Sequence, residues 1–177
     1  MSTAASRLGT LLPRATTTLP ALLPVRAARR GDATALAALS RPFVRSGELR
    51  ERSLSRYASD ATDFLVVEAC DGALAGCLGL RVHPADPARG GGPTGVLYNF
   101  CVAPRRQGRG VGAQLLRAAL DRATAQSLDA LFTATTGGGG LFLRYGFAPA
   151  RAGLAPAAWA NSLDPRRNSR VLAWHSV

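Results

Sequence analysis

The feature that most constrains the fold is a glycine-dense turn between an apolar strand and an amphipathic helix. The apolar segment 95–102 runs into Pro104–Gly112, which carries Gly108, Gly110 and Gly112. Because glycine has no Cβ, several N–H groups can point at one ligand, and the positive end of the helix dipole adds to them. The turn therefore predicts a binding site for phosphate oxygens. Apolar residues at helical spacing follow it, at Leu115, Leu116, Ala119, Leu120 and Ala123.

The segments on both sides of this turn predict a mixed α/β (α+β) domain over residues 25–177, with strands before and after a central helix. Asp32 is the expected N-cap of a first helix. The turn Asp71-Gly72 predicts a hairpin between two strands. The other expected elements are a short helix at Leu49–Tyr57, strands at Phe64–Ala69, Ala73–Val82 and Leu128–Thr136, a flexible Gly137–Gly140 joint, a helical Leu141–Tyr145, and closing strands at Phe147 and Arg170–Trp174.

Residues 1–24 are expected to form a basic N-terminal tail. The first 31 residues contain no Asp or Glu and are rich in Ser, Thr and Pro. This composition fits a disordered tail, an organelle transit peptide, or coding sequence added by an upstream start codon. The three alternatives stay open, so the expected cytoplasmic location leaves organelle targeting possible.

The charge is strongly positive, with 22 basic against 11 acidic residues and a net charge of +11. All the basic residues are arginines, they are scattered, and aromatic residues make up 6% of the chain. A nucleic-acid-binding surface needs a clustered basic track and aromatic rings for stacking, so we expect no nucleic-acid partner. A diffuse positive field would still attract an anionic cofactor or an acidic substrate.

The three cysteines Cys70, Cys77 and Cys101 lie on predicted strands and lack metal-ligand spacing. We expect them to be small core residues in a reducing compartment, with no metal site. No apolar run approaches the roughly 18 residues that a membrane span needs, so no membrane partner is expected.

Two alternatives to a simple phosphate site are open at the glycine turn. The spacing Gly108-x-Gly110-x-x-Ala113 also matches a dinucleotide-binding fingerprint. That interpretation requires an acidic residue at the end of the next strand, whereas Asp129 lies at its start. The other alternative is a tight turn that binds nothing.

The segment Gln107–Gly112 resembles the Gln/Arg-x-x-Gly-x-Gly/Ala acyl-CoA signature of the GCN5-related N-acetyltransferase (GNAT) family. The first helix, the hairpin, the signature helix and the ending Phe142-x-x-x-Gly146-Phe147 follow in that family's order. The resemblance implies the GNAT fold, a mixed, mostly antiparallel central sheet flanked by helices. Within the family, three stretches are similar to the acetyltransferase domain of N-acetylglutamate synthases: Arg41–Val44, Leu131–Thr136 and Arg166–Leu172.

The resemblance implies an enzyme that transfers an acetyl group from acetyl-CoA, its co-substrate, to the amino group of a small amino acid. L-Glutamate is the favoured acceptor. The cofactor-binding residues implied in this way are Phe100, Cys101, Val102, Gln107, Gly108, Arg109, Gly110, Val111 and Gly112.

By the same resemblance, Arg52 would bind the α-carboxylate, and Arg167 with Ser169 the side-chain carboxylate. Arginine suits this role because its planar fork pairs bidentately with a carboxylate. Thr135 would protonate the leaving thiolate, and Tyr98 is the second candidate for proton transfer.

Two departures from the family pattern leave the acceptor and the base open. Val96 and Leu97 stand where the synthases have a carboxylate, and Leu143 stands where many members have a tyrosine. Tyr98 or His83 could assist proton transfer, although His83 also fits an ordinary loop histidine. The alternatives are therefore a different amine acceptor, such as another amino acid, an antibiotic or a protein N-terminus, and an acyl-CoA-binding module without activity. A homodimer is also possible.

Overall fold

A single seven-stranded sheet organises the chain, and the computed structural model describes residues 24–87 and 90–176. The predicted tail, apart from residue 24, lies outside the described residues. The strand order is β1-β2-β3-β4-β5-β7-β6, and every neighbouring pair is antiparallel except β4 and β5. The mixed, mostly antiparallel sheet that we predicted is confirmed. The strands are β1 (Arg26–Ala27), β2 (Phe64–Glu68), β3 (Leu74–His83), β4 (Thr94–Val102), β5 (Ala130–Thr135), β6 (Ala148–Pro149) and β7 (Arg170–His175).

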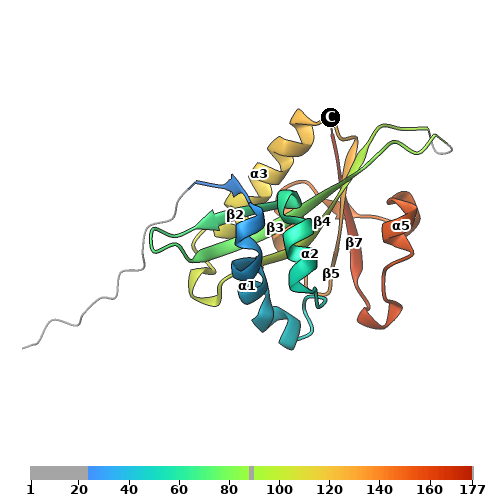
Figure 1. Ribbon diagram of the computed structural model, residues 1–177. Coiled ribbons are helices and arrows are strands. Elements are labelled where there is room, and N and C mark those ends of the chain that lie inside the picture. Colours follow the sequence, from blue (N-terminus) through green and yellow to red (C-terminus); the bar gives the residue numbers. More distant parts are fainter. Residues whose placement is uncertain (1–23, 88–89, 177) are drawn as a thin grey trace, which may run out of the picture.

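Helices cover both faces of this sheet (Figure 1). The central helix α3 (Val111–Ala125) and the short α4 (Gly140–Arg144) lie on one face, and α1 (Ala33–Arg45) and α2 (Leu54–Ser59) lie on the other. The four-residue α5 (Ala157–Ala160) packs by Trp159 against β4, β5 and β7. Short 3-10 turns are η1 (Arg30–Asp32), η2 (Ala61–Asp63), η3 (Pro104–Arg106), η4 (Ala152–Leu154) and η5 (Pro165–Arg167).

The core divides along the same two faces, because successive side chains of a strand point to opposite sides. Leu78, Leu80 and Leu97 face α3, whose Leu115 and Leu116 are fully buried against them. On the other face, α1 and α2 bury a second cluster that includes Leu36, Tyr57, Phe64, Val66 and Cys77. The apolar pattern predicted for α3 is therefore confirmed as its buried face.

Two local predictions were wrong in detail, and a third holds for position alone. Asp32 occupies the N-cap position of α1, but its carboxylate accepts hydrogen bonds from the Arg29 N–H and from Arg26 instead of capping that helix. The second helix begins at Leu54 and not at Leu49, because Ser53 caps it by accepting a hydrogen bond from the Arg56 N–H. Cys70 is exposed in the hairpin turn, whereas Cys77 and Cys101 are core residues as expected.

A β-bulge interrupts β4 at the level where the predicted cofactor residues begin. The register between β3 and β4 shifts between the pairs Cys77↔Cys101 and Gly79↔Tyr98. Within the bulge Asn99 has a φ of +49°, a left-handed conformation that costs a non-glycine residue about 1–2 kcal/mol. Something in the surrounding structure must offset that cost.

The side chain of Asn99 supplies that compensation through buried hydrogen bonds. Its Nδ2 donates to Ser40 Oγ on α1 at 2.9 Å, and its Oδ1 accepts from the Tyr57 hydroxyl on α2 at 3.2 Å. Ser40 in turn donates to the Leu36 carbonyl at 2.8 Å. The bulge is thus held by two helices that pack on the same face of the sheet.

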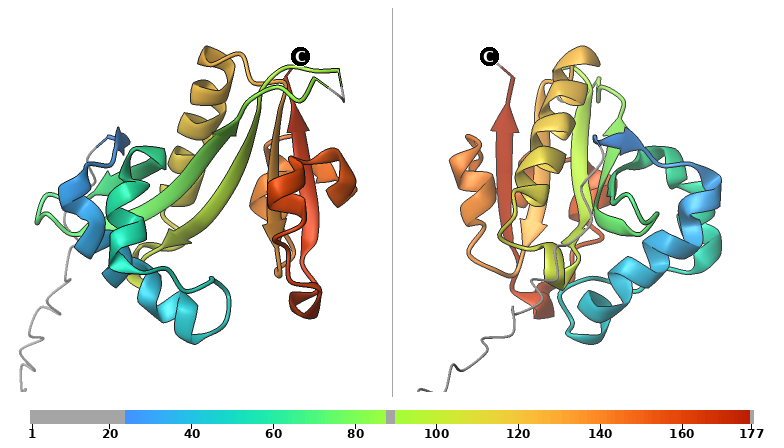
Figure 2. Two further views of the ribbon diagram at one scale, coloured as in Figure 1. Left: turned by 45° about the vertical axis from the view of Figure 1, so that its right-hand side comes forward. Right: turned by 90° about the vertical axis from the view of Figure 1, so that its left-hand side faces the viewer.

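Beyond the paired segment, β4 and β5 diverge. Their parallel pairing joins Thr94–Val96 to Ala130–Phe132 and ends there. One residue further on, Thr133 Oγ1 donates to the Leu97 carbonyl at 3.3 Å, and the strands then splay apart as the two arms of a V (Figure 2). The backbone of β4 after the bulge faces the opening on that side.

We expect Asn99→Ala to lower the free energy of unfolding by about 2–4 kcal/mol. The alanine keeps the left-handed backbone cost and leaves the buried Ser40 and Tyr57 hydroxyls without one partner. Urea unfolding would measure the loss. The control is Asn168→Ala, because Asn168 has a similar φ of +46° but is exposed; that change should cost about 1 kcal/mol. Equal losses in the two variants would contradict the role assigned to the buried hydrogen bonds.

Candidate active site

A cleft of about 830 Å³ occupies the opening between the two strands. One wall is β4 from Val96 to Val102, and the other is the end of β5 with the turn that follows it, residues 133–137. The α1–α2 connection and the 158–169 segment extend the cleft on the side of α1. The cleft therefore brings together four regions that are far apart in the sequence.

Of the predicted cofactor-binding residues, Phe100, Cys101, Val102, Gln107 and Gly112 line this cleft. The Phe100 ring packs edge-on against Phe142 of α4, with ring centroids 5.6 Å apart. A Cβ at Gly112 would come within 3.2 Å of Leu141 and 3.4 Å of Phe100. A larger residue there would press on both side chains, because the first turn of α3 lies close to Phe100 of β4 and Leu141 of α4.

The other residues of the glycine turn surround the start of α3. Gly108 and Gly110 have φ values of +70° and +83°, and both are exposed, as is Arg109. Gln107 donates from Nε2 to the Val102 carbonyl at 3.2 Å, which ties the turn to β4. Val111 differs from its neighbours because its side chain is buried in the core under α3.

This turn fits a pyrophosphate group. The first N–H groups of α3 have no acceptor inside the helix, since the earliest intrahelical bond from the turn is Gln114 N to Gly110 O at 3.0 Å. Both left-handed glycines are open, with no heavy atom within 4 Å of a Cβ built on them. The dinucleotide alternative does not fit, because Asp129 lies at the far end of the parallel strands and accepts a hydrogen bond from Gly92 N–H.

A network of charged groups around Tyr98 forms the other end of the cleft. Arg52 donates to Asp60 Oδ2 at 3.1 Å, and Arg81 contacts the same oxygen at 2.7 Å. Arg81 also donates from Nε to Asp63 Oδ2 at 3.0 Å. The two carboxylates therefore balance the charge of the two arginines, and hold them in place beside the cleft.

The Tyr98 side chain lies in the middle of this network. Its hydroxyl donates to Asp63 Oδ2 at 2.9 Å, and the Arg52 guanidinium carbon is 4.5 Å from the ring centre. Burial and the Asp63 charge raise the pKa of Tyr98 well above its ordinary value. The hydroxyl is thus protonated at neutral pH, and its proton is held by Asp63, so it is a poor acceptor for a proton from an ammonium group.

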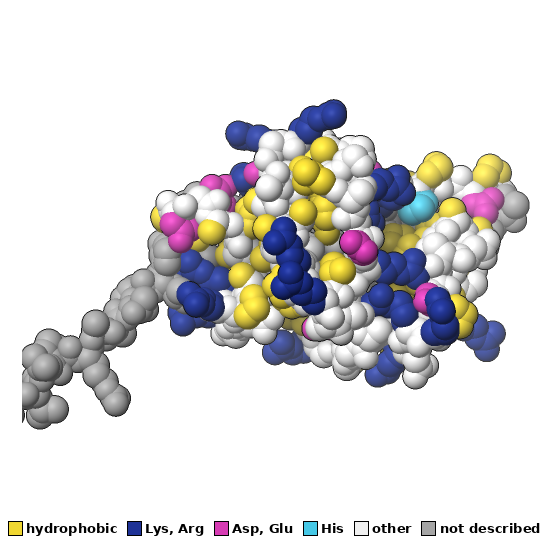
Figure 3. Space-filling view, turned by 60° about the horizontal axis from the view of Figure 1, so that its bottom comes forward, with side chains coloured by type: hydrophobic (Ala, Val, Ile, Leu, Met, Phe, Trp, Pro, Cys, Tyr) yellow, Lys and Arg dark blue, Asp and Glu magenta, His cyan; other side chains and the backbone are white. Residues whose placement is uncertain are grey.

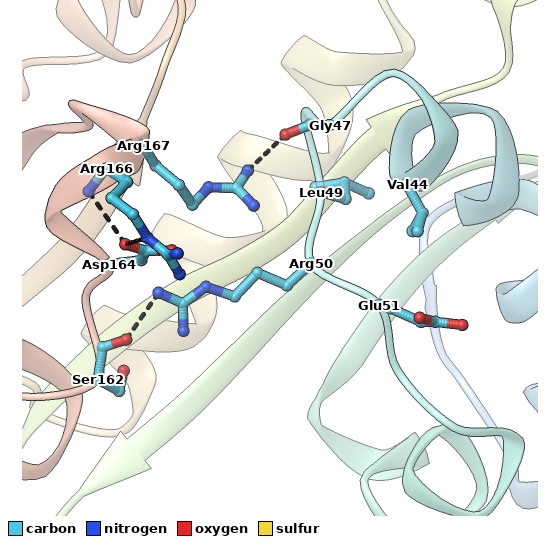
Figure 4. Close-up of a pocket in the computed structure, with 9 residues that line it drawn as sticks. All are labelled: Val44, Gly47, Leu49, Arg50, Glu51, Ser162, Asp164, Arg166 and Arg167. Carbon is cyan, nitrogen blue, oxygen red and sulfur yellow. Dashed lines mark hydrogen bonds and ion pairs between the residues drawn. The ribbon is translucent and has the colours of Figure 1, made fainter.

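Arg167 and Ser169 approach the cleft from the opposite side. Arg167 Nη2 donates to the carbonyls of Gly47 and Glu48, at 2.8 and 2.7 Å. Arg50, in the α1–α2 connection, donates back to the segment that carries Arg167, to the Ser162 carbonyl at 2.6 Å. Figure 4 shows the two arginines crossing a hollow of about 680 Å³ that adjoins the cleft. These three hydrogen bonds join the loop residues 47–50 to Ser162 and Arg167, and we call them the arginine clasp.

Thr135 stands at the end of β5, where it lines the cleft opposite β4. Its Oγ1 accepts a hydrogen bond from the Gly137 N–H at 3.2 Å. Since that bond uses an acceptor lone pair, the hydroxyl proton stays available to a group in the cleft. Tyr145, which lies two residues after Leu143, does not line the cleft, and its hydroxyl accepts from Arg117 on α3 at 3.0 Å.

Positive charge dominates the lining of the cleft. Arginine side chains gather beside a hollow on the face shown in Figure 3. Five arginines line the cleft with Glu48 as the acidic lining residue. Such a surface suits an acceptor that carries carboxylates. The arginines are Arg50, Arg52, Arg56, Arg81 and Arg167.

The sequence analysis missed four residues that position the site: Asn99, Arg81, Asp60 and Asp63. An asparagine inside an apolar strand was the available signal for the bulge, because Asn tolerates a left-handed backbone. For Arg81, the signal was an arginine on the strand that pairs with the cofactor strand. No pattern of neighbouring residues could have predicted that Asp60 and Asp63 pair with Arg81, since these contacts join separate elements.

The family model for the acetyltransferase (GNAT) family matches residues 33–147, which is more than half of the chain. The chain therefore belongs to the GNAT family, a class of N-acetyltransferases. The amino-acid acetyltransferase of Ralstonia nicotianae is 32% identical over 148 residues, covering 84% of this chain and 31% of that protein. The amino-acid acetyltransferase of Pseudomonas fluorescens is also 32% identical, and the match covers 83% of this chain and 32% of that protein. The chain thus spans about a third of the length of these curated relatives.

Solved structures agree on the fold. N-acetylglutamate synthase from Neisseria gonorrhoeae, complexed with coenzyme A and N-acetyl-glutamate, has a TM-score of 0.75 at 29% identity and covers 87% of this chain and 35% of that one. Rv2747 from Mycobacterium tuberculosis has a TM-score of 0.71, covering 86% of this chain and 99% of that one. Its 22% identity supports the fold alone.

Two further findings concern residues 24–87 and 90–176. None of their helices has the length and apolar character needed to cross a bilayer. Nor do these residues bring three or more His, Cys, Asp or Glu side chains together as metal ligands.

Gly79 tests how firmly Tyr98 is held. A Cβ at Gly79 would come within 2.6 Å of the Tyr98 ring, so we expect Gly79→Ala to cost about 1–3 kcal/mol of unfolding free energy. The same change in a Tyr98→Ala background should cost clearly less, because the ring is gone. A double-mutant cycle by urea unfolding measures the difference. An equal loss of unfolding free energy in both backgrounds would show that the Tyr98 ring is not what the added methyl group meets.

Proposed function

We propose that this domain transfers the acetyl group of acetyl-CoA to the α-amino group of L-glutamate. The observation that carries the proposal is a single cleft lined at one end by Gln107 and Gly112 of the glycine turn and at the other by arginines. Coenzyme A has an anionic pyrophosphate and glutamate has two carboxylates, so both ends match in charge. The relatives named amino-acid acetyltransferase and N-acetylglutamate synthase support this acceptor.

At the donor end, acetyl-CoA supplies an activated acetyl thioester. The N–H groups at the start of α3, with Gly108 and Gly110, would hold the pyrophosphate, while Arg109 adds positive charge. The β4 segment from Phe100 to Val102, which follows the bulge, lines the opening between β4 and β5. Its polar groups would orient the pantetheine and the thioester carbonyl for attack.

At the acceptor end, Arg167 is the main candidate to bind a carboxylate. Its two hydrogen bonds to main-chain carbonyls both use Nη2, so the Nε and Nη1 donors remain for a ligand in the cleft. Ser169 lies two residues further on and also lines the cleft. Arg52 would bind the second carboxylate from the opposite wall while Asp60 fixes its orientation.

Proton transfers complete the reaction. An ammonium group loses two protons as it becomes an amide, and one of them ends on the thiol of coenzyme A. Thr135 would pass a proton to the leaving sulfur from the β5 wall, because its hydroxyl proton is not used by its contact with Gly137. Tyr98, the second candidate, would have to release its hydrogen bond to Asp63 before it could donate.

A second candidate is acetylation of a different amine. The ion pair between Arg52 and Asp60 favours it, because a partly neutralised arginine attracts a carboxylate less strongly. A homodimer and a cytoplasmic location remain predictions.

Release of free thiol from acetyl-CoA, with a panel of single amino acids, tests the acceptor. We expect release with glutamate and weaker release with glutamine. Arg167→Ala should lower kcat/KM for glutamate by about 10- to 100-fold, as expected for a lost charged hydrogen bond. The loss should be smaller for glutamine, which a general loosening of the clasp would not produce.

The matched control is Arg166→Ala, because Arg166 is exposed and pairs with Asp164. This variant should keep the wild-type preference for glutamate. Release with other amines alone would overturn glutamate as the acceptor. Binding of acetyl-CoA without release across the panel would favour a binding module.

Gly110→Ala tests the donor end. The substitution meets no neighbour within 4 Å but forces alanine into a φ of +83°, at a cost of about 1–2 kcal/mol. We expect a weaker affinity for acetyl-CoA by about 10-fold and an unchanged KM for the acceptor. Calorimetric titration measures the affinity. Gly153→Ala, at an open glycine without a left-handed φ, is the control, and an equal effect of both changes would contradict the pyrophosphate site.

A further inference from the structure

The position of His83 carries an inference that rests on the proposed function and deepens it. We propose that His83 is the general base that takes the first proton from the acceptor's ammonium group. Neither the family model nor the relatives' names assign this residue a role.

His83 lies at the end of β3 and lines the acceptor end of the cleft. It pairs with Thr94 of β4, while Arg81, two residues earlier on the same face, pairs with Val96. His83 is therefore one diagonal step from Val96, at a Cα separation of about 7–8 Å that an imidazole side chain can reach across. That places it beside the β4 wall where the acceptor would lie.

The other titratable side chains of the cleft are poorly suited to accept a proton. The five arginines are always protonated. Tyr98 already donates to Asp63 and has a raised pKa. Cys101 turns its sulfur into the core, 3.6 Å from that of Cys77. Glu48 is exposed at the outer end of the α1–α2 connection, where it accepts a hydrogen bond from Ser46.

The surroundings of His83 keep its imidazole in the neutral form. Burial and the charge of Arg81 lower its pKa, and the negative charge of Asp63 opposes them. Tyr98 on β4 and Arg52 from the α1–α2 connection line the same end of the cleft, and Arg52 adds to the positive side. A neutral imidazole at pH 7 is the form that can accept a proton.

The proton balance of the reaction leaves one proton for such a group. His83 accepts it from the ammonium, which frees the nitrogen lone pair to attack the thioester carbonyl. The C–N bond forms and the C–S bond breaks. The second nitrogen proton goes to the leaving thiolate, through Thr135 or Tyr98. His83 then returns its proton to water, since the adjoining residues 84–87 are exposed.

The experiment compares wild type, His83→Ala and His83→Gln in steady-state kinetics with the acceptor that the panel identifies. We expect kcat to fall by about 100- to 1000-fold in both variants, as for a lost general base. The KM for acetyl-CoA should change little. In wild type, kcat/KM should fall as the pH drops below the imidazole pKa, and this acidic limb should be absent from the variants.

Two further measurements separate a base from a structural residue. Added imidazole should restore part of the activity of His83→Ala and none of that of His83→Gln, whose side chain fills the space. The control is His175→Ala at the chain's other histidine, which is exposed on β7 and packs on Phe132; it should keep the wild-type rate and profile.

An active wild type whose acidic limb persists in both His83 variants would overturn this inference and leave the proposed function intact. A wild type that binds acetyl-CoA but releases no thiol with any acceptor would instead overturn the proposed function.

Discussion

The site depends on one buried hydrogen-bonded residue. Asn99 is held in a left-handed conformation by Ser40 of α1 and Tyr57 of α2, and this produces the bulge in β4. The bulge shifts the register of β4 on β3 before the Cys77↔Cys101 pair. On its other edge β4 leaves β5 after the Val96↔Phe132 pair, and the cleft opens between them. Packing on one face of the sheet thus sets the geometry of a site that lies between two strands.

The acceptor end depends on electrostatic balance more than on excess charge. Arg52 and Arg81 share the Asp60 carboxylate, and Arg81 reaches Asp63 as well, so both guanidinium groups are held in fixed positions. Burial opposes ionisation of Asp60, but the hydrogen bond and charge of Arg81 prevail and keep the pKa of Asp60 low. Because the balance is internal, an entering carboxylate meets oriented donors and a moderate positive field, which favours selectivity over simple attraction.

Local signals in the sequence predicted the parts of the fold that are local. The glycines at 108, 110 and 112, the periodicity of α3 and the Asp71-Gly72 turn each depend on adjacent residues, and the structure agrees with them. The predicted start of α2 was wrong because Ser53 caps that helix from Leu54 onward. Asp32 does occupy the N-cap of α1, but its carboxylate binds Arg26 instead of the helix. The bulge and the Arg81 network join residues from separate elements, so no spacing in the sequence could reveal them.

The arginine clasp has a consequence for how such a domain can change. Arg50 and Arg167 donate to carbonyl oxygens of the main chain, at Ser162, Gly47 and Glu48. Every residue type carries that oxygen, so the side chains at positions 48 and 162 can be replaced while the clasp keeps the same contacts. The wall that faces the acceptor is therefore fixed in shape but free in composition. A new substrate preference could arise there by substitution alone, without refolding the loop that carries it.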